Sequence, residues 1–413
     1  MNSSAFATET ILYNFGATVG DGGQPLSAVT FAPNGELYGT TTVGGKCSLE
    51  EGGCGNVFKL APPQAGSTTW SESVIYDFQN TGDGWDPAAA VTMDSSGNLY
   101  GTTSIGGVVY RLSPPSGSAS AWSFSTLYTF GQAGDKSQYY LSSPLIVSGS
   151  LMGVASQAAG GNGAVYKIAP PASSGGAWVG SLPYSFSAVA QPFGGLVRDD
   201  HGNLYGTAAG AGGTGTNGCG TSCGFVFELS PNVASKTGWT ETVLYSFTGA
   251  SEAYSPSSTL TIDAVGNLYG TALGGTCTKE PHGCGTVFRL APPATDQTSW
   301  TETVLHVFGG KKDGRFPTGA LALDDHGNIY GATVEGGIDC LKNLDPDGCG
   351  TVFKLKAPEN GATTWKKTTL HIFGVQPDGE MPVGGLTMHG GKLYGTTQWG
   401  GTVGGGTVFM VTP

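Results

Sequence analysis

Charged side chains are scarce in this sequence. Only 12% of its 413 residues are Asp, Glu, Lys or Arg, about half the share usual in globular domains. The charges that are present are mainly acidic, with 30 Asp and Glu against 18 Lys and Arg and a net charge of −12. A basic surface that could hold a phosphate backbone is therefore missing, and we predict no nucleic-acid partner.

Long apolar runs are missing as well. No stretch approaches the ~18 consecutive apolar residues of a membrane span, so no transmembrane segment is predicted. The first residues, MNSSAFATET, have neither the basic nor the apolar region of a secretory signal. The 71 glycines follow no three-residue period and 38% of the residues are hydrophobic, which excludes collagen and argues against disorder. The chain can therefore build a large hydrophobic core.

The eight cysteines fall into four local pairs: Cys47 with Cys54, Cys219 with Cys223, Cys277 with Cys284, and Cys340 with Cys349. Each pair occupies the same place in a repeat, where a disulfide could staple a long loop. Zinc is the alternative, but each loop offers two thiolates, and only CTKEPHGC adds a further ligand, His282. We predict four disulfides and an oxidising compartment. We expect an extracellular or cell-surface protein whose signal peptide and anchor lie outside this chain.

One pentapeptide returns along the chain. NLYGT stands at 98–102, 203–207 and 267–271, with the variants NIYGA at 328–332 and KLYGT at 392–396. It is the second of four phrases that recur in fixed order in seven units, about 58 residues apart. The first phrase is apolar, as in AAAVTMD, the third is GxVFxL, and the fourth runs from Trp to Phe, as in WTETVLYSF. A catalytic phrase would need one copy, so we interpret LYGT as scaffold, with its glycine marking a close backbone approach near the crowded axis.

Each phrase is short, rich in β-branched and aromatic residues, and bounded by Gly, Pro, Asn or Asp, which is typical of strands. Four antiparallel strands in each of seven units predict an all-β, seven-bladed β-propeller that forms a single domain over 1–413. The seventh unit lacks its fourth phrase, and ATETILYNF near the N-terminus matches it. We expect residues 8–15 to pair with 406–411 and close the ring. The expected blades are about 25–78, 87–130, 144–186, 192–247, 256–308, 317–373 and 382–411.

The succession of NLYGTT, a glycine-rich loop, GTVFRLAPP and WTETVLYSF resembles the Gloeo_Verruco (GloVer) tandem repeats of bacterial extracellular proteins. The resemblance covers essentially the whole chain. It implies an exported, cell-surface propeller and supplies no catalytic motif that could be carried over to this sequence.

Loops joining the fourth strand of one blade to the next blade share a face with loops joining strands two and three. Aromatic and charged residues gather in these loops, and aromatic rings beside hydrogen-bonding groups suit the faces and hydroxyls of sugars. The candidate ligand-binding residues are Trp85, Lys136, Tyr139, Tyr140, Tyr254, Arg315, Phe316 and Trp399, with Phe193 a further aromatic residue of the face. The alternative is that these aromatic residues cap the core between blades. Because the loops of blades two and three are short, we expect a groove there.

Carboxylates on the same face are candidates for catalysis: Asp83, Asp86, Asp135, Asp378 and Glu380. Glycoside hydrolysis needs two carboxylates about 5–10 Å apart. GDG and PDG sequences are also ordinary turns, and no GxSxG, HExxH or P-loop pattern is present. Whether the protein is an enzyme therefore stays open at this stage.

We favour a secreted or cell-surface module that binds an extracellular polysaccharide. The first alternative is a glycan-cleaving enzyme, either a glycoside hydrolase or a polysaccharide lyase, and the second is a protein that assembles with itself into a surface layer or filament. No cofactor or metal site is predicted. The DSSGN and DDHGN segments faintly resemble calcium loops but lack the ligand spacing of an EF-hand, so turns are favoured and structural calcium stays an alternative.

Overall fold

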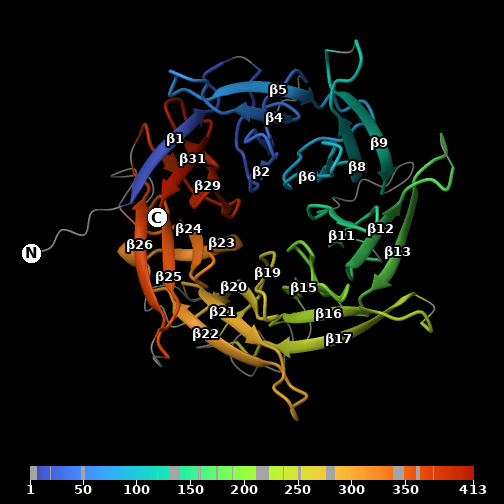
Figure 1. Ribbon diagram of the computed structural model, residues 1–413, viewed down its shortest axis with the longest axis vertical. Helices are drawn as coiled ribbons and strands as arrows, with labels where there is room; N and C mark the ends of the chain where they lie inside the picture. The colour runs from blue at the N-terminus through green and yellow to red at the C-terminus, as the bar shows by residue number, and fades with distance from the viewer. Residues whose placement is uncertain are drawn as a thin grey trace, which may run out of the picture.

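Seven four-stranded antiparallel sheets stand around a common axis like the blades of a propeller (Figure 1). This confirms the fold predicted from the sequence. The computed structural model describes residues 7–18, 20–47, 52–118, 120–130, 140–156, 158, 160–173, 175–187, 189–210, 223–235, 237–249, 253–275, 284–337, 348–359, 363–374 and 376–413. Among these residues the helical structure is one 3₁₀ turn, Lys311–Asp313. None of the described helical structure is long and apolar enough to cross a membrane.

The first three blades run from the axis outward in chain order. Blade one is β2 (Thr30–Phe31), β3 (Leu37–Thr41), β4 (Asn56–Ala61) and β5 (Ser71–Asp77). Blade two is β6 (Thr92–Met93), β7 (Leu99–Thr102), β8 (Val108–Ser113) and β9 (Ser123–Thr129). Blade three is β10 (Leu145–Val147), β11 (Ser150–Ala155), β12 (Ala164–Ala169) and β13 (Val179–Ser185).

The next three blades repeat this order. Blade four is β14 (Val197–Arg198), β15 (Leu204–Ala208), β16 (Phe225–Pro231) and β17 (Trp239–Ser246). Blade five is β19 (Thr261–Ile262), β20 (Leu268–Gly274), β21 (Thr286–Ala291) and β22 (Thr301–Val307), with β18 (Ala253–Tyr254) also paired to β20. Blade six is β23 (Arg315–Leu323), β24 (Ile329–Glu335), β25 (Thr351–Lys356) and β26 (Lys366–Ile372).

Blade seven combines both ends of the chain. It contains β28 (Thr387–His389), β29 (Lys392–Thr397), β31 (Thr407–Thr412) and, as its outermost strand, β1 (Thr8–Asn14). Thr8 lies opposite Thr412 and Asn14 opposite Thr407 in the antiparallel ladder, and Figure 1 shows β1 beside β31. Two short strands form a separate antiparallel pair: β27 (Gly379–Glu380), which precedes β28, and β30 (Trp399–Gly400), which lies between β29 and β31 in the sequence. The predicted closure of the ring by the N-terminal strand is confirmed.

The glycine of LYGT makes room for an aromatic ring. Gly39 in β3 pairs across the ladder with Phe58 in β4, and a Cβ atom on Gly39 would lie 2.4 Å from the Cζ atom of Phe58. In blade four, Gly206 and Phe227 repeat this relation at 2.5 Å. The close approach therefore comes from the ring of the third strand, which covers the glycine, and not from backbone at the axis as we had expected.

The tyrosine of LYGT fastens the preceding turn. The Tyr100 hydroxyl donates to Asp94 at 3.0 Å, and the same carboxylate accepts hydrogen bonds from the Ser96 and Asn98 amides, both at 2.9 Å. Burial alone would raise the pKa of Asp94, but the hydrogen bonds from Asn98 and Tyr100 hold it below its ordinary value. DSSGN is therefore a hairpin turn that is organised by its first carboxylate.

The threonine of LYGT connects one blade to the next. The Thr207 hydroxyl donates to the Ser258 carbonyl at 3.0 Å, and the Thr396 hydroxyl donates to the Ser27 carbonyl at 2.8 Å. These bonds lie where the first strands of neighbouring blades come close to the axis. The repeated phrase is therefore scaffold at each of its polar positions.

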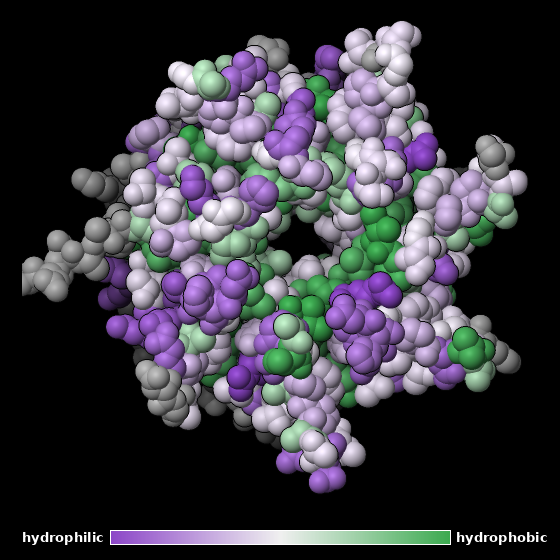
Figure 2. All heavy atoms as spheres, viewed as in Figure 1, coloured by the Kyte–Doolittle hydropathy of each residue, from purple (hydrophilic) through white to green (hydrophobic). Residues whose placement is uncertain are grey.

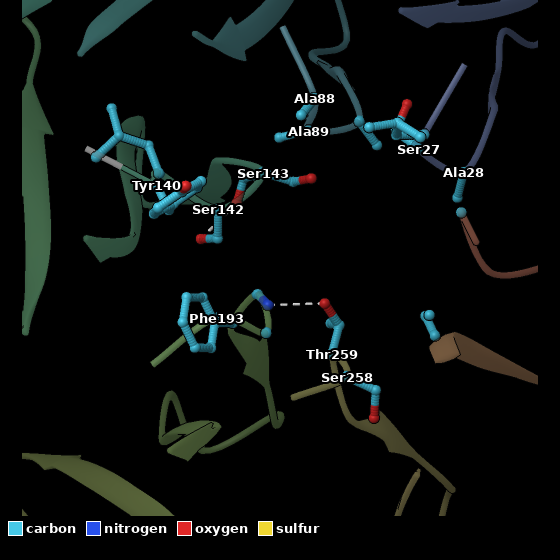
Figure 3. A pocket seen from close by; sticks show the side chains of 18 of the residues that line it. Ser27, Ala28, Ala88, Ala89, Tyr140, Ser142, Ser143, Phe193, Ser258 and Thr259 are labelled. Carbon is cyan, nitrogen blue, oxygen red and sulfur yellow. Dashed lines mark hydrogen bonds between the residues drawn. The ribbon is translucent and has the colours of Figure 1, made fainter. Parts of the chain in front are cut away.

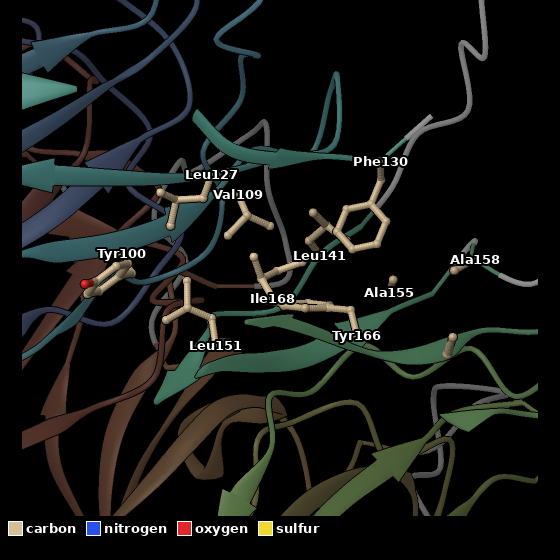
Figure 4. Close-up of a cluster of buried hydrophobic side chains, with 11 residues drawn as sticks. Tyr100, Val109, Leu127, Phe130, Leu141, Leu151, Ala155, Ala158, Tyr166 and Ile168 are labelled. Carbon is tan, nitrogen blue, oxygen red and sulfur yellow. The ribbon is translucent and has the colours of Figure 1, made fainter. Parts of the chain in front are cut away.

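Hydrophobic clusters fill the space between blades. Figure 4 shows the cluster between blades two and three, where Val109 and Leu127 meet Leu151, Tyr166 and Ile168. Seven clusters of this kind occur among the described residues. Both faces of each blade are therefore packed, which explains why the strands do not alternate strictly between apolar and polar residues.

One predicted disulfide lies wholly within the described residues, and it is present between Cys47 and Cys54. Three further described cysteines, Cys223, Cys284 and Cys349, are also disulfide-bonded. Their expected partners, Cys219, Cys277 and Cys340, lie outside the described residues, and so does His282.

Candidate functional site

A central pocket of about 620 Å³ lies at the axis of the ring. All seven blades contribute to it. The contributing residues lie two or three positions before the first strand in six blades and within β23 in blade six: Ser27, Ala89, Ser143, Gly194, Ser258, Gly319 and Gly384. Figure 3 shows small side chains from several blades around a common space. Sequence analysis missed this lining. The available signal was a run of small residues at the same place in every unit, such as AAA, GG or SST.

Two exposed aromatic rings stand on one side of the central pocket (Figure 3). Tyr140 of blade three is 45% exposed, and Phe193 of blade four is 42% exposed. Their ring centroids are 6.2 Å apart, with an angle of 71° between the ring planes. Aromatic side chains at a concave surface are a common feature of small-ligand sites.

In the rest of the central pocket, serine and threonine hydroxyls lie among apolar side chains. Some are held by the scaffold: the Ser27 and Thr40 hydroxyls bond each other at 2.9 Å, and Thr259 accepts the Gly195 amide at 2.7 Å (Figure 3). Ser143 and Ser257 add further hydroxyl groups to this lining. The wall can therefore offer polar groups to a ligand without presenting a charge.

The described lining of the central pocket contains no Asp, Glu, Lys, Arg or His. The nearest link to a carboxylate runs through Ser104, which lines the pocket and hydrogen-bonds Asp86. Burial raises the pKa of Asp86, and the bond from Ser104 opposes that shift. In a chain of net charge −12, the described wall of the central pocket is thus uncharged.

The candidate carboxylates Asp83 and Asp378 organise their own loops. Asp83 is buried and accepts hydrogen bonds from the Tyr76 hydroxyl at 2.9 Å, the Gln79 amide at 2.8 Å and the Thr81 amide at 3.0 Å. Asp378 accepts the Gly374 amide at 2.9 Å and the Gly379 amide at 2.8 Å. Both have the geometry of turn-forming residues, the alternative that the GDG and PDG sequences left open. Glu380 lies in β27, opposite Trp399.

The other candidate ligand residues do not line the central pocket. Trp85 and Tyr254 are half-buried and pack against hydrophobic clusters between blades, as the capping alternative predicts. Arg315 is buried, with its Nε atom 2.6 Å from Glu335 and its guanidinium 5.4 Å from the centre of the Phe316 ring. Trp399 is 38% exposed.

Three candidates, Asp135, Lys136 and Tyr139, lie outside the described residues, so the groove expected at blades two and three stays a prediction. Of the candidate ligand residues inside the described part of the chain, the structure brings Tyr140 into the central pocket and sets Phe193 beside it.

The fold defines a seven-bladed propeller built from tandem repeats, with an uncharged pocket on its axis. The chain belongs to the Gloeobacter/Verrucomicrobia repeat family, whose family model matches residues 140–366. A second family model, Tachylectin, matches residues 7–186. No curated protein matches the chain.

Solved structures share the architecture at low sequence identity. The polysaccharide lyase Uly1 is 11% identical with a TM-score of 0.50, over 98% of this chain and 92% of that chain. The PQQ domain of pyranose dehydrogenase from Coprinopsis cinerea is 13% identical with a TM-score of 0.45, over 98% and 97% of the two chains. The likeness to the lyase, at 11% identity, shows a common fold alone and does not transfer an activity.

Proposed function

We propose that this protein is an extracellular glycan-binding propeller that holds an uncharged sugar unit in its central pocket. The observation that carries the proposal is the exposed pair Tyr140 and Phe193 at a pocket lined by hydroxyls and small side chains. The match to the Tachylectin family model, which is a lectin family, supports the same ligand class.

The chemistry of the lining fits a neutral sugar. A pyranose ring has an apolar C–H face, which packs on an aromatic ring, and hydroxyls, which need donors and acceptors. The central pocket offers both. Its volume of about 620 Å³ lies within the roughly 300–1,000 Å³ typical of small-ligand pockets. A strongly anionic sugar would find no cation on the described wall.

Binding is favoured over cleavage because the described wall lacks an acid–base pair. Glycosidases place two carboxyl groups beside the bond they break. Asp83 and Asp378 are instead engaged by backbone amides of their own loops. An extracellular location is supported by the Cys47–Cys54 disulfide and by the disulfide-bonded state of the other described cysteines, since such bonds persist in oxidising compartments.

The test is retention of the oxidised protein on immobilised polysaccharides, with neutral glucans, xylans and galactans in one set and uronate-rich or sulfated polymers in another. New reducing or unsaturated ends are measured in the same tubes. We expect retention on a neutral polymer without new ends. Because each aromatic contact contributes about 0.5–1.5 kcal/mol, the double variant Tyr140→Ala, Phe193→Ala should lower the affinity at least about fivefold.

Trp399→Ala is the matched control, because it removes an exposed aromatic ring that does not line the central pocket. It should bind like the wild type. Unchanged binding by the double variant, or a loss caused by Trp399→Ala alone, would place the site elsewhere. New chain ends would make the protein an enzyme.

A further inference from the structure

A cluster of three metal-ligand side chains lies between blades six and seven. Glu9 comes from β1, His371 from β26, and Asp378 from the loop that connects the two blades. One ligand atom of each residue lies within 4.8 Å of the others. The Nε2 atom of His371 is 3.2 Å from Asp378 Oδ2, and both side chains are mostly buried, with 16% and 19% exposure. This cluster is separate from the central pocket.

One carboxylate oxygen in this cluster has no partner. The Oε1 atom of Glu9 is buried and makes no hydrogen bond to the described residues. A buried carboxylate beside a second carboxylate is unfavourable unless a cation compensates both.

The preceding blade interface contains the same arrangement with a cation built in. There His306 Nε2 lies 3.1 Å from Asp313 Oδ2, and the Gly309 amide donates to that oxygen at 2.8 Å. In the same way, His371 Nε2 lies 3.2 Å from Asp378 Oδ2, and the Gly374 amide donates to that oxygen at 2.9 Å. The third member of that cluster is Lys367, whose Nζ atom lies 2.9 Å from Asp313 Oδ1.

Lys367 and Glu9 occupy equivalent positions in their blades. Each is the second residue of its strand as the structure bounds it, and each faces the fifth residue of the neighbouring third strand, Leu355 for Lys367 and Val411 for Glu9. The chain thus supplies an ammonium group at one interface and a carboxylate at the next. The second interface lacks the positive charge that the first contains.

We propose that Glu9, His371 and Asp378 bind a divalent transition-metal ion, best represented by Zn²⁺, in the place that the Lys367 ammonium has one interface earlier. One imidazole nitrogen and two carboxylate oxygens suit Zn²⁺. Ca²⁺ and Mg²⁺ prefer oxygen ligands alone. The ion joins the strand that closes the ring to the neighbouring blade, so its role is structural.

The experiment uses the full oxidised chain after removal of metal with EDTA. ZnCl₂ is titrated by calorimetry, and Tm is measured with and without the ion. We expect one equivalent to bind and to raise Tm, because an ion that binds the folded state stabilises it. Glu9→Lys copies the Lys367 interface, so this variant should bind no Zn²⁺ and should melt no lower than the metal-free wild type.

Glu72→Gln is the matched control. Glu72 occupies the equivalent position in blade one, where it lies near Asp21 and Asp77 and no imidazole contributes. It should take up Zn²⁺ like the wild type. Co²⁺ replaces Zn²⁺ for a spectroscopic check on the wild type: imidazole and carboxylate ligands give weak d–d bands and no thiolate charge-transfer band.

The proposal is overturned if the wild type binds no Zn²⁺ up to 100-fold excess, if folded Glu9→Lys still binds one equivalent, or if the Co²⁺ spectrum shows thiolate. Should Glu9→Lys fail to fold, Glu9→Gln is measured in its place, and retention of the full wild-type affinity by that variant would equally reject the site.

Discussion

The buried tyrosines Tyr110 and Tyr166 allow a matched test of how polar groups contribute to this core. Both are fully buried and lie opposite the LYGT-position glycine of their blade, Gly101 and Gly153. The Tyr166 hydroxyl donates to the Ser142 carbonyl at 3.1 Å. The Tyr110 hydroxyl has no hydrogen-bond partner among the described residues. The other five blades have phenylalanine at this place: Phe58, Phe227, Phe288, Phe353 and Phe409.

We therefore expect the same substitution to have opposite effects. Tyr110→Phe removes a buried hydroxyl that pays a desolvation penalty, and should stabilise the protein by about 1 kcal/mol. Tyr166→Phe leaves the Ser142 carbonyl with only the longer hydrogen bond, 3.4 Å, from the Thr102 hydroxyl. This variant should destabilise the protein by about 1 kcal/mol. The two variants should thus differ by about 2 kcal/mol, a separation of a few degrees in Tm at this chain length.

The assay is urea-induced unfolding followed by tryptophan fluorescence and by circular dichroism, with calorimetric Tm as a second measure. Gly101 and Gly153 stay unchanged, so packing beneath the two rings is preserved. If Tyr110→Phe destabilised the protein as much as Tyr166→Phe does, the Tyr110 hydroxyl would have a partner, such as an internal water, and our account of this core would be wrong.

Further predictions concern the repeat, the pH dependence and the disulfide. Gly206→Ala places a methyl group 2.5 Å from the Phe227 ring, so this variant should destabilise the protein by about 1–3 kcal/mol in urea unfolding. Adding Phe227→Leu should recover part of the lost stability. No recovery would contradict the contact between the ring and the glycine. Burial and neighbouring carboxylates raise the pKa of Glu72 to about 7 from 4.5, so this group's contribution to stability is complete below pH 4.5 and is lost as the pH rises through 7. Glu72→Gln should therefore stabilise the protein at pH 8, by about 1–2 kcal/mol after allowance for solvent screening, and should leave its stability unchanged near pH 4. Equal effects at both pH values would show that the pKa of Glu72 is not raised by folding. Replacing Cys47 and Cys54 with Ser removes a disulfide with a sequence separation of 7. The gain in chain entropy of the unfolded state should lower the stability by about 2.5 kcal/mol. An unchanged Tm would contradict this prediction.

The architecture could be predicted from the sequence because the same four strand-forming segments recur in seven units. Each unit carries its own strand and turn signals, so errors in one unit are corrected by the others. Even the closure of the ring could be predicted, since TETILYN of β1 has the letters of a fourth strand. The reason for the LYGT glycine was less accessible, because it depends on which side of β4 the Phe58 ring occupies.

The candidate site was harder to predict because the residues with the chemistry expected of a sugar site, such as Asp83 and Trp85, do not line the central pocket. Asp83 and Trp85 are residue types that occur in sugar-binding sites. In the structure, however, backbone amides donate hydrogen bonds to Asp83, and Trp85 packs against a hydrophobic cluster between blades. More than half of the residues that line the central pocket are alanine, glycine or serine, which carry little signal individually. Glu9 and His371 lie near opposite ends of the sequence, so their proximity exists only once the ring has closed.

The pairing of β1 with β31 also determines the order in which this molecule can be made. During synthesis β1 leaves the ribosome before the other strands of the propeller, whereas its ladder partner, residues 407–412, is the last of these strands to emerge. Until then one edge of β1 has no partner, and such edges favour aggregation and exchange between chains. In a circular permutant that joins β31 to β1 and opens between two other blades, all four strands of blade seven would be consecutive in the sequence. We expect this permutant to refold with less aggregation than the chain with its present strand order.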